Sequence, residues 1–473
     1  MELFFKLSDK VLFRQYNDYG YITGNSLFGY RFLSDKTPVL GEKFVSRSGS
    51  VMLGMLSRIP QELDTIVTKL LNIFVDVDYE VLKRDTCDFF VELAKEGYID
   101  YGNSFNECKE NTSESYRNSI TLSTDDSSSL FDVPQKNFLR SIHFEIANIC
   151  NERCIHCFIP EKYKINLIDP SLFYKIVEEG RAMNIIHVTL TGGEPLLHPN
   201  FIDFLKKCRE LDLSVNVLSN LTLLTDEIIS EMKNNHLLSV QTSLYSMTPM
   251  IHDTITQLKG SFEKTKSGIL RLIAAGIPIQ VSCQVMKQNK DSFTDVIQWG
   301  NTNNIPVTFN YIIFGEYDRT NVNLQNRLSV NEIEEAFNKQ VSKDYAQSLL
   351  TEAKKTMSLN IDTPICSVCR YYFGVSAEGD AFPCAGWQAK KLGNLKKQSV
   401  KEIWEDSQEV DYLRQIKLRH FSKCVDCKDR GFCNICMMTN SNESSDGNIF
   451  HISKFQCDTA AMLHSKVENY LKS

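Results

Sequence analysis

SIHFEIANICNERCIHC, residues 141–157, joins an alternating apolar segment to three closely spaced cysteines. The alternation of apolar and polar residues in SIHFEIAN predicts a β-strand. Cys150, Cys154 and Cys157 follow it with the spacing C-x3-C-x2-C. A structural zinc site requires four ligands, whereas a [4Fe–4S] cluster held by three thiolates keeps one iron open for another ligand. The stretch therefore predicts a strand that leads into an iron–sulfur centre able to bind a substrate.

A zinc site completed by His156 is the alternative interpretation of this motif. His156 and Cys157 are adjacent in the chain, which places them poorly for binding one ion together. The cluster interpretation is therefore favoured.

Five further apolar segments follow, each separated from the next by a helical pattern. They are residues 185–193, 213–220, 237–245, 277–286 and 305–315. Repeated βα units predict a parallel sheet, either open or curled into a partial barrel.

The rest of the chain divides by composition. Residues 1–103 combine strand and helix patterns, with an NDYG turn and a further strand at 28–35, and predict a winged-helix-like α+β module. The predicted organisation is this module, a Ser-, Asn-, Thr- and acid-rich linker at 104–136, the barrel at 137–327, a helical bridge at 328–363, and a cysteine-rich domain at 364–473.

Composition narrows the class of protein. The 473 residues are 42% hydrophobic and 23% charged, as in soluble globular proteins of several domains. No apolar run is long enough for a membrane span, and no secretory signal is recognisable, so we expect a cytoplasmic protein whose fifteen cysteines stay reduced. The net charge is −7, and residues 1–100 carry twelve Lys and Arg against fifteen Asp and Glu, which disfavours nucleic-acid binding.

Eight cysteines in the C-terminal domain are enough for two four-ligand sites. A sequential division assigns the run CVDCKDRGFCNIC, residues 424–436, to one site, whereas an interleaved division mixes it with the earlier cysteines, and the count alone does not choose. Two structural zinc sites are the alternative to two clusters. The eight are Cys366, Cys369, Cys384, Cys424, Cys427, Cys433, Cys436 and Cys457.

The cysteine triplet, together with TGGEP at residues 191–195, resembles the signature of the radical S-adenosylmethionine (SAM) superfamily. The resemblance implies a partial (β/α)6 barrel and a [4Fe–4S] cluster on Cys150, Cys154 and Cys157 whose open iron binds SAM. That SAM is the source of a 5′-deoxyadenosyl radical, which abstracts hydrogen from carbon. The cofactor-binding residues that the resemblance implies are His156, Gly192, Gly193, Glu194, Pro195, Ser219, Asn220, Ser243 and Ile313. Of these, Ser243 at the end of the fourth strand would contact the ribose, and Ile313 on the last strand would cover the adenine.

Two positions depart from the superfamily pattern. Many relatives carry an acid where this chain has Tyr245. Many also carry an arginine after the His-Asp pair, where His252 and Asp253 lead to Thr256. SAM contacts are not carried over to these positions.

GVSAEGDAFPCAGW, residues 374–387, and the later cysteines resemble the SPASM extension of radical SAM peptide maturases. The resemblance implies two auxiliary [4Fe–4S] clusters that are fully ligated by protein. The first would use Cys366, Cys369, Cys384 and Cys436, and the second Cys424, Cys427, Cys433 and Cys457. Two residues separate Cys433 from Cys436 where three are usual.

The N-terminal module more weakly resembles the peptide-recognition element of enzymes that modify ribosomally made peptides. Such modules bind a leader peptide as an extra strand along a sheet edge, expected here within residues 27–50. A structural cap on the barrel is the alternative.

The predicted function is oxidative crosslinking of a precursor peptide, through a thioether or a carbon–carbon bond. Joining two X–H groups removes two hydrogens, so an electron acceptor is needed, and a flavodoxin or ferredoxin is expected as the electron donor to the SAM cluster. The alternatives are oxidation of Ser or Cys to an aldehyde, as in sulfatase maturases; Cα epimerisation, with Cys283 as the candidate hydrogen donor; and a non-catalytic, metal-bound winged-helix regulator.

Overall fold

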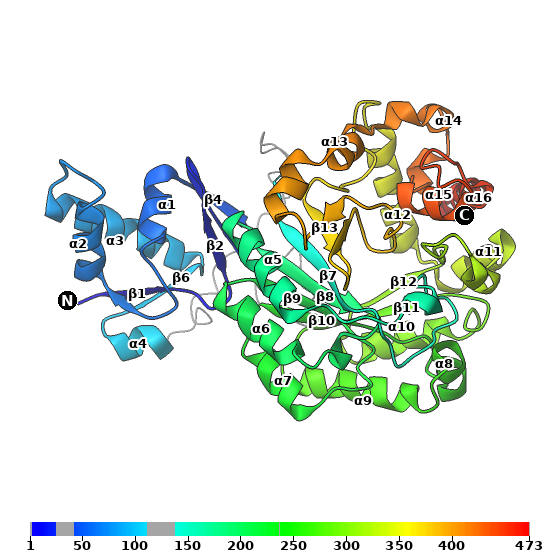
Figure 1. Cartoon of the computed structure of the whole chain (residues 1–473), viewed down its shortest axis with the longest axis horizontal. Coiled ribbons are helices and arrows are strands. Elements are labelled where there is room, and N and C mark those ends of the chain that lie inside the picture. The colour runs from blue at the N-terminus through cyan, green and yellow to red at the C-terminus, as the bar shows by residue number, and fades with distance from the viewer. Residues whose placement is uncertain (1, 25–41, 111–137, 236, 473) are drawn as a thin grey trace.

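A parallel-strand barrel lies at the centre of the molecule, with an N-terminal module at one end and the cysteine-rich domain along one side (Figure 1). The computed structural model describes residues 2–24, 42–110, 138–235 and 237–472. Within these residues, no helix combines the length and the apolar character needed to cross a membrane.

The barrel contains all six predicted strands, in sequential order and parallel to one another. They are β7 (Ser141–Ala147), β8 (His187–Gly192), β9 (Ser214–Leu218), β10 (Leu238–Ser243), β11 (Ile279–Gln284) and β12 (Val307–Asn310). The connecting helices are α5 (Pro170–Ala182), α6 (Phe201–Glu210), α7 (Asp226–Lys233), α8 (Pro249–Thr256), α9 (Ser261–Ala274) and α10 (Phe293–Thr302). The predicted partial barrel is confirmed.

The two faces of the barrel sheet differ in chemistry because successive side chains point to opposite sides of a strand. Ile142 and Phe144 of β7 are fully buried on the outer face, where Phe144 packs on Phe173 of α5 with ring centroids 4.9 Å apart. The alternate residues of β7, His143 and Glu145, point into the lumen. Similar alternation on the other strands gives the lumen a polar wall.

The barrel sheet continues into the cysteine-rich domain, which the sequence did not predict. β13 (Tyr372–Val375) pairs in parallel with β7, from Tyr372 opposite Ser141 to Val375 opposite Phe144. β14 (Asp380–Phe382) and β15 (Gly393–Asn394) then add antiparallel strands. The region around Cys384 is thereby attached to the first barrel strand.

The N-terminal module contains two three-stranded sheets and helices. One sheet has the order β5-β1-β6 and the other β2-β3-β4. Their strands are β1 (Phe4–Leu7), β2 (Leu12–Gln15), β3 (Tyr19–Thr23), β4 (Glu42–Ser46), β5 (Gln61–Glu62) and β6 (Ile99–Gly102), and the helices are α1 (Arg47–Leu53), α2 (Leu63–Leu71) and α3 (Tyr79–Lys95). The hairpin expected at NDYG is formed by β2 and β3, and the strand expected at 28–35 lies outside the described residues.

The predicted linker needs a correction at its start. Residues Phe105–Glu110 form the helix α4, and Cys108 is fully buried against β6. A methyl group on Gly102 would lie 2.5 Å from the backbone nitrogen of Cys108, so the glycine permits this close approach. Residues 111–136 of the predicted linker lie outside the described residues.

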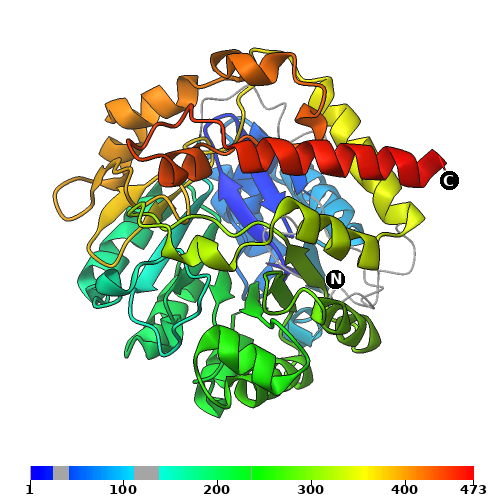
Figure 2. The ribbon, with the colours of Figure 1, turned by 90° about the vertical axis from the view of Figure 1, so that its right-hand side faces the viewer.

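The module is docked on the end of the barrel where strands β8 and β9 begin. Arg14 is buried and donates hydrogen bonds to the carbonyl oxygens of Ile185 at 3.0 Å and Asp212 at 2.5 Å. Tyr21 packs in an apolar cluster with Ile186. Figure 2 shows the strands of the module behind the barrel. The opposite end of the barrel bears the predicted cofactor site.

The C-terminal part of the chain contributes a further set of helices. They are α11 (Val330–Gln340), α12 (Lys343–Met357), α13 (Gln408–Gln415), α14 (Ser422–Val425), α15 (Met437–Glu443) and α16 (Lys454–Lys472). α11 and α12 occupy the predicted helical bridge, and both pack on α16.

Candidate functional site

The three cysteines of the first motif lie together at the carboxyl ends of the barrel strands. Cys150, Cys154 and Cys157 line a cavity of ≈350 Å³, whose walls come from the ends of the strands and the loops that follow them. Ligand sites of parallel barrels form at this end of the strands. Burial raises the pKa of the Cys150 thiol to about 12, and bound iron would supply the positive charge that an ionised thiolate needs.

The TGGEP turn is packed directly against the cysteine loop. Gly192 has φ +128°, and a Cβ there would lie 2.1 Å from the carbonyl oxygen of Ala147. A Cβ on Gly193 would lie 2.3 Å from the carbonyl oxygen of Ile149. The backbone N–H of Glu194 donates to that same oxygen of Ile149 at 2.9 Å. Only glycine fits at both positions, and both glycines line the cavity.

Glu194 is buried next to the cavity but does not line it. Its carboxylate is fully buried and accepts hydrogen bonds from the Ser219 hydroxyl at 2.8 Å, the Asn220 N–H at 2.7 Å and the Leu196 N–H at 2.9 Å. Burial raises the pKa of Glu194 to about 7. Ser219 and Asn220 line the cavity, whereas Glu194 and Pro195 do not. The carboxylate therefore positions these two cavity residues.

Ser243 and Ile313 both line the cavity, and the position of Ile313 corrects a prediction. Ser243 is the last residue of β10, as predicted. β12 ends at Asn310, so Ile313 lies beyond the strand. The side-chain oxygen of Asn310 accepts a hydrogen bond from the N–H of Ile312 at 2.8 Å, a turn that ends the strand. Ile313 is buried beside Tyr245 and Met286.

Tyr245 lines the cavity, at the position where the superfamily resemblance implies an acid. Its hydroxyl lies 3.3 Å from Nε2 of His156, and their rings meet edge to face. Burial lowers the pKa of His156 to about 4, so the imidazole is neutral at pH 7. Asp253 instead caps the start of α9 through the N–H groups of Gly260 and Phe262, and neither it nor Thr256 lines the cavity.

The cavity residues that were not identified from the sequence include two charged side chains and two glutamines. Glu152 and Lys164 are the charged side chains of the wall, and Gln241 and Gln284 extend from the lumen faces of β10 and β11. Burial raises the pKa of Glu152 to about 7. Polar residues at alternate positions of LSVQTS and IQVSCQ are the signal that indicates the two glutamines.

Cys283 lies on the opposite face of β11 from this cavity. It is fully buried in the core between sheet and helices, and its thiol donates to the carbonyl oxygen of Tyr245 at 3.7 Å. Among the described residues, the thiols of this cavity wall are those of the C-x3-C-x2-C motif.

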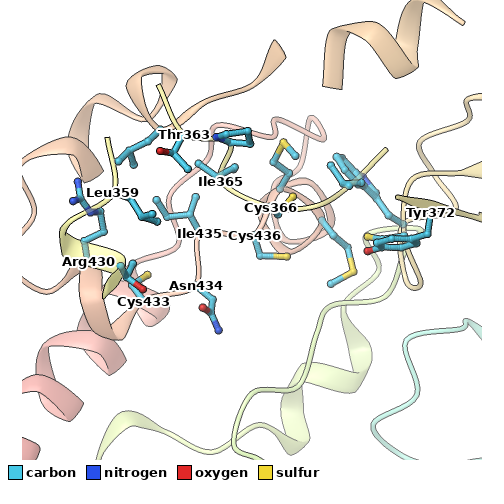
Figure 3. A pocket seen from close by; sticks show the side chains of 18 residues that line it. Leu359, Thr363, Ile365, Cys366, Tyr372, Arg430, Cys433, Asn434, Ile435 and Cys436 are labelled. Carbon is cyan, nitrogen blue, oxygen red and sulfur yellow. The ribbon is translucent and has the colours of Figure 1, made fainter. Parts of the chain in front are cut away.

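A second thiol group lies in the C-terminal domain. Cys366, Cys384 and Cys436 line a cavity of ≈390 Å³ (Figure 3). Burial raises the pKa of Cys384 well above its usual value, and the nearby thiols of Cys436, Cys366 and Cys369 raise it further. These four cysteines therefore lie close together, although Cys436 is distant from the others in sequence.

A third thiol group lines a neighbouring cavity of ≈120 Å³. Its members are Cys424, Cys427, Cys433 and Cys457. Burial raises the pKa of Cys433 to about 12, and the other three thiols contribute to the increase. Cys433 also borders the second cavity. The run from Cys424 to Cys436 is thus divided between two groups.

The donor set of each group fits an iron–sulfur cluster. Within residues 2–24, 42–110, 138–235 and 237–472, no three His, Cys, Asp or Glu side chains converge closely enough to hold a single metal ion. The thiols instead surround cavities, as expected when each sulfur binds a different iron. Four thiols in each C-terminal group match the four irons of one cubane cluster.

Comparison with protein families gives two matches along the chain. Residues 144–300 match the model of the radical SAM superfamily. Residues 366–428 match SPASM, an iron–sulfur cluster-binding domain. The first range covers most of the barrel, and the second begins at Cys366.

Individual similar proteins include two curated relatives. The AdoMet-dependent heme synthase of Methanosarcina barkeri is 23% identical over 329 residues, covering 64% of this chain and 93% of the relative. AlbA of Bacillus subtilis, an antilisterial bacteriocin subtilosin biosynthesis protein, is 26% identical over 318 residues, covering 65% of this chain and 69% of the relative.

Solved structures share the fold over most of the chain. SuiB of Streptococcus suis, crystallised with its precursor peptide SuiA, has a TM-score of 0.58 at 12% identity, covering 96% of this chain and 100% of SuiB. The AdoMet-bound protein anSMEcpe has a TM-score of 0.54 at 15% identity, covering 71% of this chain and 95% of its own. The shared architecture thus includes the barrel and its C-terminal extension.

Proposed function

Because the chain is a radical SAM enzyme with a SPASM extension, we propose that it modifies a ribosomally made precursor peptide by an oxidative crosslink. The new bond is a thioether or a carbon–carbon bond. The leader part of the peptide binds the N-terminal module, and the core part enters the barrel lumen.

The enzyme binds SAM at a [4Fe–4S] cluster and holds auxiliary iron–sulfur clusters. We assign the first cluster to Cys150, Cys154 and Cys157, with SAM against Gly192 and Gly193. The auxiliary clusters are assigned to the second and third thiol groups. When bound, these cofactors supply the radical chemistry that breaks an unactivated C–H bond and the acceptors for the electron that the crosslink releases.

The observation that carries the peptide assignment is the N-terminal module docked on the barrel. Within the described part of this module, β4 pairs only with β3 and so forms a sheet edge. Phe44 on this strand is 37% exposed and packs on Tyr19 and Tyr21. An exposed edge with an aromatic residue suits addition of a peptide strand. β4 falls within the predicted range 27–50, of which residues 27–41 lie outside the described residues.

Two comparisons support this assignment. SuiB, whose fold covers 96% of this chain, was crystallised with a precursor peptide. AlbA is a bacteriocin biosynthesis protein. Epimerisation is disfavoured because Cys283 is buried on the outer face of the sheet, where it does not line the cavity.

Anaerobic co-expression with a short peptide encoded beside the gene tests the proposal. A crosslink lowers the peptide mass by about 2 Da, since two hydrogens leave, and fragmentation then shows two joined residues. An aldehyde gives the same mass loss at a single residue, and epimerisation gives none. Cys154→Ala is the control and should leave the peptide unmodified. An unchanged peptide in the presence of fully iron-loaded enzyme would contradict the proposal.

A further inference from the structure

Arg430 lies in the wall between the second and third thiol groups. It begins the short helix η7 (Arg430–Phe432), within the loop that joins Cys427 to Cys433. Its side chain lines both the ≈390 Å³ cavity and the ≈120 Å³ cavity. Figure 3 shows Arg430 and Cys433 at one end of the larger cavity, with Cys366 and Cys436 farther along it. Arg430 therefore borders both cavities that hold the proposed cluster ligands.

This cation is buried without a carboxylate partner among the described residues. Arg430 is only 7% exposed. Its Nη1 and Nη2 donate to neutral carbonyl oxygens, those of Val425 at 2.6 Å and Met357 at 2.9 Å. Its Nε is buried and has no hydrogen-bond partner within the described residues. The neighbouring acid, Asp429, is paired with His464 at 2.7 Å.

A buried charge without a counter-ion is strongly unfavourable. A negative group close to the guanidinium would offset this cost. Among the described residues that line the two cavities, Asp429 is the one carboxylate, and the other acidic groups are cysteine thiols and the Tyr372 phenol, which lies at the far end from Arg430 (Figure 3). The iron–sulfur core of a cluster is positively charged, but the four thiolates that bind it carry more negative charge in total. The ligated cluster would therefore be an anion and would supply the missing counter-ion.

We propose that Arg430 is the shared counter-ion of the two auxiliary clusters and raises the reduction potential of both. Each cluster gains one negative charge when it takes up an electron, and a fixed cation between them reduces the cost of that gain. The inference rests on the proposed function, because it requires clusters in both thiol groups. Arg430 thereby favours electron acceptance by the two clusters.

Two other cations near these thiols differ from Arg430 because each is paired with a carboxylate. Arg414 donates to the carbonyl oxygen of Cys369 at 2.7 Å but also pairs with Asp411 at 3.4 Å. Lys454, three residues before Cys457 in the chain, is paired with Asp458 and has a side chain 86% exposed. A paired or exposed cation is compensated or screened, whereas Arg430 is neither paired with an acid nor exposed.

Redox titration of the anaerobically reconstituted holoenzyme, followed by electron paramagnetic resonance, tests the proposal. In Arg430→Gln the equilibrium constant for reduction of both auxiliary clusters should fall about tenfold, which for a one-electron couple is a negative shift of about 59 mV. Arg430→Lys should retain most of the wild-type potential. Arg419→Gln is the matched control, because Arg419 is 48% exposed and paired with Asp362, and it should shift neither potential. The cluster on the first motif should be unchanged in all three variants.

Iron content separates failure of this inference from failure of the proposed function. Wild-type protein with fewer than about twelve irons per chain lacks one of the three clusters, which would overturn the cluster assignment itself. Full iron with unchanged potentials in Arg430→Gln, or a shift confined to one cluster, would overturn only the shared counter-ion.

The melting temperature of the iron-free protein tests the proposal if the Arg430→Gln variant does not bind iron. In the full chain stripped of iron, Arg430→Gln should melt no lower than wild type, because the buried charge then has no counter-ion in either thiol group. A lower melting temperature in the stripped variant would show that Arg430 acts mainly through the carbonyl groups of Val425 and Met357, and would overturn the inference.

Discussion

Replacing Cys436 with alanine tests how the eight C-terminal cysteines are divided. Cys436 is the N-cap of α15, where its sulfur accepts a hydrogen bond from the N–H of Thr439 at 3.5 Å. Loss of an N-cap costs about 1 kcal/mol, which a domain of this size tolerates. The main effect of Cys436→Ala should therefore be loss of an iron ligand, and circular dichroism should confirm an intact fold.

The expected magnitude follows from the thiol groups. Three [4Fe–4S] clusters contain about twelve irons per chain. Cys436 lies with Cys366, Cys369 and Cys384, so Cys436→Ala should lose the first auxiliary cluster and retain about eight irons. Cys427 belongs to the other group, so Cys427→Ala should also retain about eight, and the double variant only about four.

Iron and sulfide analysis of anaerobically reconstituted protein distinguishes the two divisions. In a sequential division Cys427 and Cys436 would serve one cluster, and the double variant would still hold about eight irons. That result would refute the interleaved assignment. Retention of all irons and of both auxiliary spectra in Cys436→Ala would refute the role of this cysteine as a ligand.

Two further predictions concern the barrel. Gly193→Ala should destabilise the protein by about 3 kcal/mol and abolish SAM binding, because its methyl group would lie 2.3 Å from a carbonyl oxygen. The control Gly276→Ala, at φ +74° with no atom within 4 Å, should cost only about 1 kcal/mol. Thermal melting measures the stability of both variants, and titration with SAM measures binding. Burial raises the pKa of Glu145 from 4.5 in the unfolded chain to about 8 in the folded protein. Its contribution to the free energy of unfolding is therefore fully present below pH 4.5 and is lost as the pH rises through 8, a decrease of up to about 5 kcal/mol. Glu145→Gln should flatten the dependence of melting temperature on pH across this interval, and an unchanged dependence would assign it to other groups.

Local patterns in the sequence predicted the barrel accurately. Each barrel strand is a short segment with its own apolar pattern, and the alternation of strands and helices specifies a parallel sheet. The position of Ser243 at the end of β10 followed directly from that pattern. The NDYG hairpin was also predictable, because the conformation of a turn depends on a few residues that are adjacent in the chain.

Features that depend on contacts between distant segments were not determined by such patterns. The end of β12 before Ile313 depends on a side-chain turn at Asn310, and the burial of Cys108 in the predicted linker depends on close approach to Gly102. The pairing of β13 with β7 joins residues more than two hundred positions apart in the chain. None of these contacts leaves a periodic signal.

The sequence by itself determined the number of thiols, their spacing, and the barrel that presents the first three. The count of cysteines left open whether Cys436 lies with Cys384 or with Cys427, and the family resemblance implied the former. Only the tertiary structure decided that Cys283 points away from the cavity and that Arg430 borders two thiol groups. The physical reason is that residue types and periodicity specify local conformation, whereas packing of segments far apart in the chain sets which side chains share a cavity and which charges lie next to them.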